Sequence, residues 1–324
     1  MSIWKLRASI IGTLAIIIGL STLFFTIILH LLNALNLTTV VLFVVIFNFI
    51  QWLIAPYLIN AIYRAKEVKP SENPKLYTMV ENLSRKSGIK MPRVMIANMP
   101  IPNAFAYGSP IAGKRVAVTT ELLNTLDDEE VEAVIGHELG HLKHHDVQVM
   151  MFISILPAIF YYIGYSMLLS SMYRRSSQDE GGGAAVIGIA ALALYWILTL
   201  FTLYLSRVRE YYADRHSASI IDEGPRKLRE GLAKIVTAAE KKRHSSMMKK
   251  SSNLNSFKAL FISDPDTSSA DVRQLAYLQD SKLVERIMER KITTFDRIQE
   301  ALSTHPNIVK RLKALKELEK ESTT

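Results

Sequence analysis

A stretch without a single charged side chain, from Ala8 to Tyr63, most constrains what this chain of 324 residues can fold into. The stretch is 56 residues long. A helix that crosses a bilayer needs about 20 apolar residues, so there is room for two crossings. The polar segment Asn33–Thr38 fits the turn between them. We therefore predict membrane spans over about residues 8–32 and 39–63.

A second charge-poor region holds another pair of apolar runs, at about residues 147–169 and 184–206. The polar, glycine-rich segment Ser170–Gly183 separates them. One such run could be a buried helix of a large soluble domain. Four runs, two of them back to back, instead favour a membrane protein. The first run is also too long for a cleaved signal peptide, and no small-residue cleavage site follows it.

Basic residues near the ends of the predicted spans indicate the orientation of the chain. Four spans put the amino-terminal end, the central segment and the carboxy-terminal part on one side of the membrane. The opposite side carries only Arg174 and Arg175, beside Asp179 and Glu180. Because basic residues are enriched on the cytoplasmic side, we expect the richer side to face the cytoplasm. Its basic residues are Lys5, Arg7, Arg64, Lys66, Lys69, Lys143, Arg207, Arg209 and Arg215.

The net charge and the lack of cysteine limit which partners and which metal ligands the protein can have. The net charge of +9 suits a protein that lies beside anionic lipid, and we expect no nucleic acid partner. The chain has no cysteine, which excludes disulfides and thiolate metal sites. A metal ion would therefore be held by histidine and carboxylate side chains alone.

The pentapeptide His137-Glu138-Leu139-Gly140-His141 is the HExxH pattern. Residues four apart share one face of a helix, so both imidazoles can reach one Zn²⁺ ion. Glu138 is then placed to take a proton from the attacking water. The pattern lies inside a helix predicted over about Leu126–His145, which begins at the capping-box sequence Thr125-Leu126-Asp127-Asp128.

The segment that leads to this helix is predicted to be a small α+β unit. Its first helix is expected over Asn73–Ser87, with Gly88 as the helix stop. Two short β-branched runs, each bounded by proline or glycine, predict strands, and a run of small residues alternating with aromatic ones is a third candidate. These strands are Arg93–Ala97, Arg115–Thr119 and Asn103–Gly108.

A zinc hydrolase needs a third protein ligand, and Glu210 is the best candidate. It follows the fourth predicted span, whereas His141 precedes the third, which starts about Asp146. Two spans separate these residues, so both half-sites return to one membrane surface. Asp214 would then accept a hydrogen bond from a ligand histidine, with His137 as first choice. Without this topology, a solvated acidic pair would be the simpler interpretation.

Four ordered motifs together resemble the HtpX family of membrane zinc metallopeptidases, which are relatives of the CaaX prenyl endopeptidases. The resemblance covers about Ala8 to Leu315. The segment Ser251–Gln274 has no counterpart that we can assign and is a candidate inserted loop. The motifs are the HExxH pattern, the pair Glu210 and Asp214, the segment Asn103-Ala104-Phe105-Ala106-Tyr107-Gly108, and Ser303-Thr304-His305-Pro306 followed by Arg311.

The resemblance implies an endopeptidase that needs no ATP, holds one Zn²⁺ per chain and acts on misfolded or unassembled membrane proteins. His305 is a candidate hydrogen-bond donor to the developing oxyanion. It stands beside proline at an expected helix start, so a capping or packing role is the alternative. The substrate would pair in extended form with the strand edge formed by Asn103, Ala104, Phe105, Ala106 and Tyr107.

Three other functions compare less well with the sequence. A zinc transporter would need ionisable ligands inside its spans, where no acid and only His30 occurs. A catalytically silent metal-binding scaffold would have no need of Glu138. A CaaX-type prenyl-protein endopeptidase remains the alternative within the protease class, although four spans are few for the large chamber of that family.

The predicted fold is mainly α, with four transmembrane helices and a cytoplasmic α+β zincin-like catalytic domain that contains a small sheet. We expect a multi-pass protein of the cell membrane, whose active site faces the cytoplasm and whose oligomeric state is open. The predicted parts are a transmembrane hairpin (1–63), a catalytic part with the HExxH helix (64–146), a second hairpin (147–206), and a part with the third ligand and a helical carboxy-terminal region (207–324).

Overall fold

The structure, a computed structural model, describes residues 37–173, 181–244 and 280–323. The first predicted span, 8–32, and the segment Ser251–Gln274 lie outside the described residues. The chain divides into two compact units. The first comprises residues up to Gln51 with Met151–Thr202, and the second comprises Trp52–Met150 with Leu203–Thr324.

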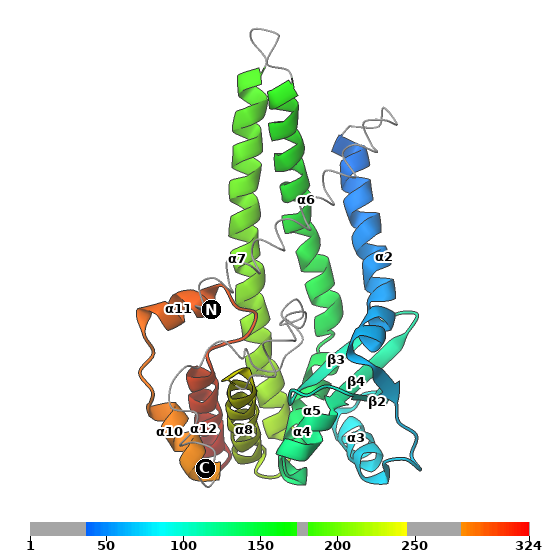
Figure 1. The fold of residues 1–324 in the computed structure, drawn as a ribbon, viewed down its shortest axis with the longest axis vertical. Coiled ribbons are helices and arrows are strands. Elements are labelled where there is room, and N and C mark those ends of the chain that lie inside the picture. The colour runs from blue at the N-terminus through cyan, green and yellow to red at the C-terminus, as the bar shows by residue number, and fades with distance from the viewer. Residues whose placement is uncertain (1–36, 174–180, 245–279, 324) are drawn as a thin grey trace. The chain divides into compact units, whose positions relative to one another are not determined.

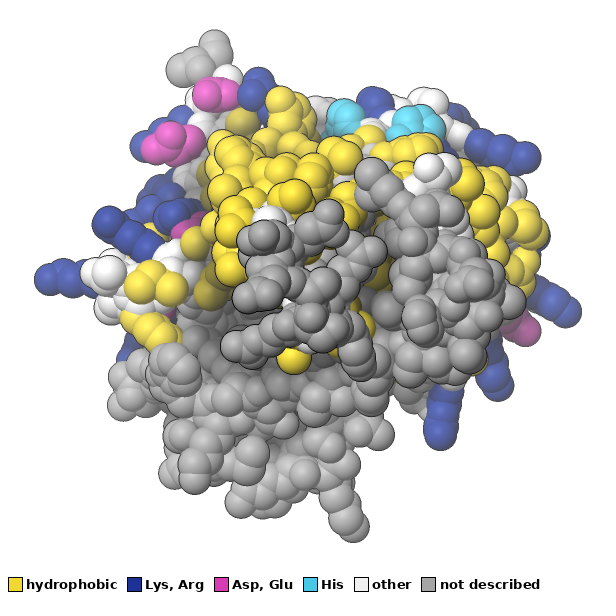
Figure 2. Space-filling model, turned by 90° about the horizontal axis from the view of Figure 1, so that it is seen from above, with side chains coloured by type: hydrophobic (Ala, Val, Ile, Leu, Met, Phe, Trp, Pro, Cys, Tyr) yellow, Lys and Arg dark blue, Asp and Glu magenta, His cyan; other side chains and the backbone are white. Residues whose placement is uncertain are grey.

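Three of the described helices are long and apolar enough to cross a membrane, and they carry the second, third and fourth predicted spans. Their apolar side chains are largely exposed, as Phe152 (63% exposed) and Phe201 (66%) illustrate. Seen from above, hydrophobic side chains gather on the described part of the surface (Figure 2). Such a surface suits lipid. The helices are α2 (Leu37–Tyr63), α6 (Asp146–Tyr173) and α7 (Gly181–Ile220).

Helix α7 continues well beyond the predicted end of the fourth span at residue 206. No glycine or proline interrupts the sequence between Ser206 and Ile220, and Gly224 and Pro225 come only later. The apolar segment and the polar segment that follows it therefore belong to one continuous helix in sequence. Glu210 and Asp214 lie on this continuation, within the second unit.

The second unit contains a four-stranded mixed sheet with strand order β1-β2-β4-β3. Strands β2 and β4 are parallel, and the other two pairs are antiparallel. The three predicted strands are confirmed, whereas β1 is too short and too charged to be recognised in the sequence. Strand β3 lies at one edge of the sheet. The strands are β1 (Ala65–Glu67), β2 (Arg93–Ala97), β3 (Ala104–Ser109) and β4 (Gly113–Thr119).

Alternating side chains of the sheet point into two different cores, as the period of two along a strand requires. Ala104 and Val116 belong to the larger core, which helices α3 (Pro74–Ser87) and α5 (Asp128–Lys143) share. Phe105 belongs to the smaller one and packs on Tyr63 at the end of α2, with ring centroids 5.1 Å apart.

The start of α5 differs from the prediction. Thr125 ends a separate short helix, α4 (Thr120–Thr125), and Leu126 is extended. The capping box starts at Asp127 instead, whose N–H donates to the Glu130 carboxylate at 2.8 Å. Because Leu126 is extended, the helix cannot continue through it, and Asp127 becomes the N-cap of α5.

The remaining described helices complete the second unit around α8. Helix α8 packs against α5, α10 and α12. Leu228 and Leu232 of α8 are fully buried, as are Leu312 and Leu315 of α12. Figure 1 shows α12 and α8 side by side next to the lower end of α7. The helices are α8 (Gly224–His244), α10 (Asp280–Glu289), α11 (Thr294–Ala301) and α12 (Ile308–Thr323).

Candidate metal centre

Two glycines let the HExxH helix α5 approach α7 closely. A Cβ atom added to Gly140 would lie 3.0 Å from the Cα of Ala213, and one added to Gly136 would lie 3.1 Å from the Oγ of Ser217. The Ser217 hydroxyl donates to the carbonyl of Ala133 at 2.7 Å and fixes the contact. This seam of small residues brings the two halves of the candidate site together.

The close approach places three potential ligand side chains around one point. Nε2 of His141 lies 3.2 Å from Nε2 of His137 and 3.4 Å from Oε1 of Glu210. Oε2 of Glu210 lies 3.6 Å from Nε2 of His137. Bonds of about 2.0–2.2 Å in tetrahedral geometry would separate neighbouring ligand atoms by roughly 3.3–3.6 Å. The three side chains therefore fit a single divalent cation.

His137 has a second carboxylate on its other ring nitrogen. Nδ1 of His137 lies 2.8 Å from Oδ1 of Asp214. The buried guanidinium of Arg311, on α12, donates to both oxygens of the same carboxylate, at 2.8 and 2.6 Å. It also lies 3.1 Å from Oε2 of Glu210. Arg311 thus ties together the two carboxylates that α7 presents, a role that its place in the sequence did not suggest.

His141 has a carboxylate of its own, which the sequence analysis missed. Asp146, the first residue of α6, lies 2.6 Å from Nδ1 of His141 and 3.1 Å from Nε of Arg209. A tight turn between α5 and α6, with His145 at φ 56°, brings Asp146 back to the preceding helix. The available signal was an aspartate five residues after the second histidine, where we predicted only the start of a membrane span.

The surrounding carboxylates determine the proton affinity of both imidazoles. Burial lowers the pKa of His141, but hydrogen bonds to Asp146 and Glu210 outweigh it and raise the pKa to about 10. Burial also lowers the pKa of His137, and Asp214 and Glu210 reverse the effect and raise it. Both imidazoles therefore sit in a strongly cation-stabilising environment, which favours a metal ion as it favours a proton.

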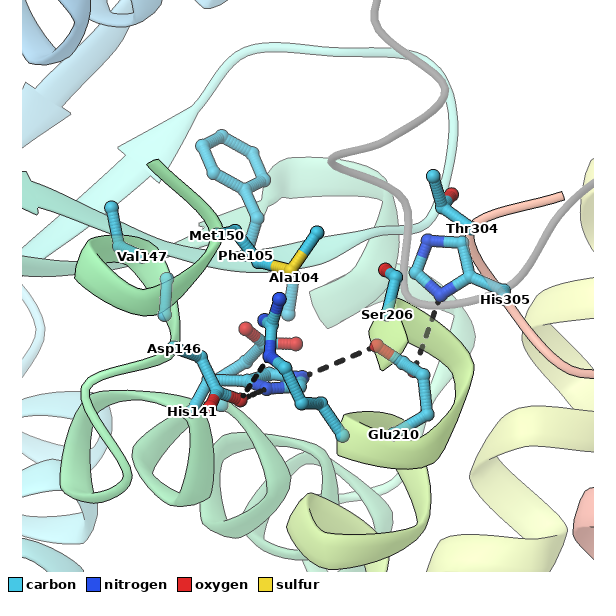
Figure 3. Close-up of a pocket in the computed structure, with 13 residues that line it drawn as sticks. Ala104, Phe105, His141, Asp146, Val147, Met150, Ser206, Glu210, Thr304 and His305 are labelled. Carbon is cyan, nitrogen blue, oxygen red and sulfur yellow. Dashed lines mark hydrogen bonds and ion pairs between the residues drawn. The ribbon is translucent and has the colours of Figure 1, made fainter. Parts of the chain in front are cut away.

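A cavity of about 270 Å³ opens beside these side chains, within the second unit. Glu138, buried and next to His137 in sequence, lines it together with His141 and Glu210. Figure 3 shows the cavity with β3 on one side and α7 on the other. A carboxylate beside a three-ligand centre can accept a proton from a water in the cavity.

His305 reaches this cavity from the segment between α11 and α12. Its Nδ1 lies 3.2 Å from Oε2 of Glu210 (Figure 3), and neither ring nitrogen makes a hydrogen bond of good geometry with the described part of the chain. Arg207 holds the segment by donating to the carbonyls of Glu300, Ala301 and Ser303 at 2.8–3.1 Å. The His305 ring is thus not a helix cap.

The predicted substrate strand is only partly at the cavity. Ala104, Phe105 and Ala106 line it. Asn103 is fully buried, and its backbone N–H donates to the Thr119 hydroxyl at 2.9 Å. The Tyr107 hydroxyl hydrogen-bonds the side-chain amide of Asn60, at 2.6 Å. Asn103 and Tyr107 therefore hold the strand in place and do not line the cavity.

Sequence comparison agrees with this geometry. The profile of peptidase family M48 matches residues 70–319. Protease HtpX homologs of Thermoplasma acidophilum and Aeropyrum pernix are 37% and 39% identical over 277 and 272 residues, covering 85% and 83% of this chain and 83% and 82% of theirs. The homolog of Picrophilus torridus is 36% identical over 327 residues, 97% of this chain and 98% of its own.

The fold is similar to that of a solved membrane protein structure. The chain matches the crystal structure of S. mikatae Ste24p with a TM-score of 0.56 and 16% sequence identity, over 96% of this chain. The match spans 66% of the Ste24p chain, so this chain is considerably shorter. The profile match and the HtpX relatives show the family, the long apolar helices indicate several membrane crossings, and the HExxH centre indicates a metal ion. The chain therefore belongs to peptidase family M48 and is a multi-pass membrane metalloprotease.

Proposed function

We propose that the protein is a zinc-dependent endopeptidase that hydrolyses misfolded membrane proteins at the cytoplasmic surface of the membrane. One observation carries the proposal: His137, His141 and Glu210 converge at ligand spacing, with Glu138 lining the same cavity. Three nitrogen and oxygen ligands with a position left for water are typical of catalytic zinc sites. The absence of cysteine leaves this set as the natural choice for zinc.

Each residue of the site has a distinct role in the proposed reaction. A bound zinc ion would polarise the scissile carbonyl and make the water more acidic. Glu138 takes the proton from the attacking water and passes it to the leaving amine. Asp214 accepts from His137 and fixes the orientation of that ring. His305 donates a hydrogen bond to the oxyanion through Nε2, which makes no hydrogen bond with the described part of the chain, whereas Nδ1 faces Glu210.

The free edge of β3 supports binding of an extended substrate. The strand pairs with β4 on one side, and no other described strand pairs with its second side. A peptide can add there as a further strand through backbone hydrogen bonds. Because this binding mode requires an extended backbone, it favours unfolded segments over folded proteins.

The domain organisation and orientation in this proposal follow from the sequence. Two transmembrane hairpins, residues 1–63 and 147–206, would carry a catalytic domain formed by residues 64–146 and 207–324. The excess of basic residues on one side supports a cytoplasmic active site. Substrates would be membrane proteins whose extended segments reach that surface.

The test uses the full chain, purified in detergent, with an unfolded model substrate. We expect cleavage that a chelator abolishes and that zinc restores. Glu138→Gln should lower kcat by at least about a hundredfold, because general-base catalysis typically contributes 10²–10⁴-fold. Zinc content is measured in parallel, and it should be unchanged because Glu138 is not a ligand.

Two variants separate catalysis from metal binding. Glu210→Ala should lose stoichiometric zinc together with activity, whereas Glu138→Gln should lose activity alone. Cleavage that persists after chelation and in Glu138→Gln would disprove the function. Full zinc retention in Glu210→Ala would show that the third ligand is another residue.

A further inference from the structure

The cavity at the metal centre has two chemically different sides. Figure 3 shows Phe105, Val147 and Met150 together on one side, and Ser206 and His305 on the other. The proposed reaction uses the polar side and the ligands between the two sides. It assigns no task to the three apolar side chains, which we call the apolar wall.

We propose that the apolar wall is a substrate subsite that binds an apolar side chain of a residue next to the scissile bond. This inference rests on the proposed endopeptidase function and adds the substrate class. The wall lies in the same cavity as Glu138 and the ligand pair His141 and Glu210. A peptide whose carbonyl reaches that centre can therefore place a neighbouring side chain against the wall.

The wall is built on rigid elements. Val147 and Met150 stand three residues apart in the first turns of α6, so they share one face of that helix. Phe105 comes from β3 and is almost fully buried. Helix and strand positions of this kind hold a pocket more firmly than loop positions do.

Charges around the cavity oppose an acidic substrate side chain at this position. The carboxylates of Glu138, Asp146 and Glu210 line the same space. Arg209 also lines it, but its Nε lies 3.1 Å from Asp146, so these two charges offset each other, and Arg311 offsets Glu210 in the same way. A substrate carboxylate would still meet the like charge of Glu138 and lose its hydration, which is a repulsive contribution to specificity.

The size of the cavity limits the side chain that fits. Its volume of about 270 Å³ includes the space beside the metal ligands. This is slightly below the roughly 300–1,000 Å³ typical of small-molecule pockets. We therefore expect aliphatic side chains such as leucine, valine and methionine to be preferred over tryptophan.

The experiment compares cleavage-site profiles of matched variants. Zinc-loaded full-length protein is incubated with an unfolded protein and a peptide mixture, and cleavage sites are mapped by mass spectrometry. Val147→Phe fills the cavity and should shift the preference from leucine to alanine. Removing or adding a methylene in such a pocket changes kcat/KM about 10- to 200-fold, so the leucine-to-alanine ratio should fall at least tenfold.

Helix α6 supplies a matched control and a second probe. Val149 is exposed on the same helix and does not line the cavity, so Val149→Phe should leave the profile unchanged. Met150→Ala enlarges the cavity and should admit phenylalanine and tryptophan. It also keeps the proposal testable if Val147→Phe does not fold.

The outcomes distinguish the subsite from the function itself. Wild-type protein that gives no zinc-dependent cleavage would refute the endopeptidase. Zinc-dependent cleavage with no apolar preference in the wild type, or with the same profile in Met150→Ala and Val147→Phe, would refute the subsite alone. Shifted profiles in these variants, with Val149→Phe unchanged, would establish it.

Discussion

Each histidine of the candidate metal centre is held by a carboxylate from a different helix. Asp214 of α7 contacts His137, and Asp146 of α6 contacts His141. Such partners fix the tautomer and the direction of a metal-binding imidazole. Helix α6 thus supplies one supporting carboxylate, Asp146. Helix α7 supplies the other, Asp214, together with the candidate ligand Glu210.

Removing the charge at Asp146 tests its supporting role. We expect Asp146→Asn to lower zinc affinity by about 10- to 100-fold, because His141 loses the carboxylate that orients and polarises it. Zinc affinity is measured by competition with a chelator, and circular dichroism monitors folding. Asp222→Asn removes an exposed carboxylate after α7 and serves as the control, with no expected change. Equal affinities in all three proteins would contradict the assignment.

At the scale of elements, the contact between α5 and α7 decides whether a site exists. Gly136 and Gly140 are four residues apart, so they form one smooth stripe on α5. The helix and both histidines are recognisable in the sequence, but nothing there assigns a role to the glycines: Gly140 is an unspecified position of HExxH, and Gly136 precedes the motif. Which helix packs against that stripe depends on the tertiary fold.

Adding one methyl group to the seam should weaken the site. In Gly140→Ala the new Cβ would lie 3.0 Å from the Cα of Ala213, which is backbone and cannot swing away. We expect an overpacking cost of about 1–3 kcal/mol, partly offset by the better helix propensity of alanine. Thermal unfolding measures the loss of stability, and zinc content measures the damage to the metal centre. We expect both the unfolding temperature and the zinc content to fall.

A glycine outside the seam provides the control for this substitution. Gly183, near the start of α7, has open space where its Cβ would be. Gly183→Ala should therefore retain the zinc content and unfolding temperature of the wild type. If Gly140→Ala behaves in the same way, the close approach of α5 and α7 is not what assembles the centre.

At the scale of the whole molecule, the absence of cysteine offers a direct test of orientation. Lys69→Cys introduces a single thiol at an exposed position of the second unit. Ser176→Cys introduces one between the third and fourth predicted spans. In intact cells, an impermeant thiol reagent should label Ser176→Cys and reach Lys69→Cys only after the membrane is opened. The reverse pattern would place the active site on the outer side.

The sequence by itself determined the membrane character, three of the strands and the three candidate ligands His137, His141 and Glu210. Those features depend on local periodicity and on side-chain chemistry, both of which are visible along a single chain. The segment 93–97 and the strand that starts at Ala104 are examples, since short runs of β-branched residues, or of small residues alternating with aromatic ones, bounded by proline or glycine are typical of strands.

Only the tertiary structure decided how these parts meet. The start of α5 at Asp128, the return of Asp146 to His141, and the link from Arg311 to Asp214 all depend on contacts between segments far apart or turned back on themselves. Local patterns carry no information about such distances. The packing of α5 on α7, with α12 beside them, sets these distances. Buried charges are stable only where their partners converge, so this packing also selects which charged side chains meet.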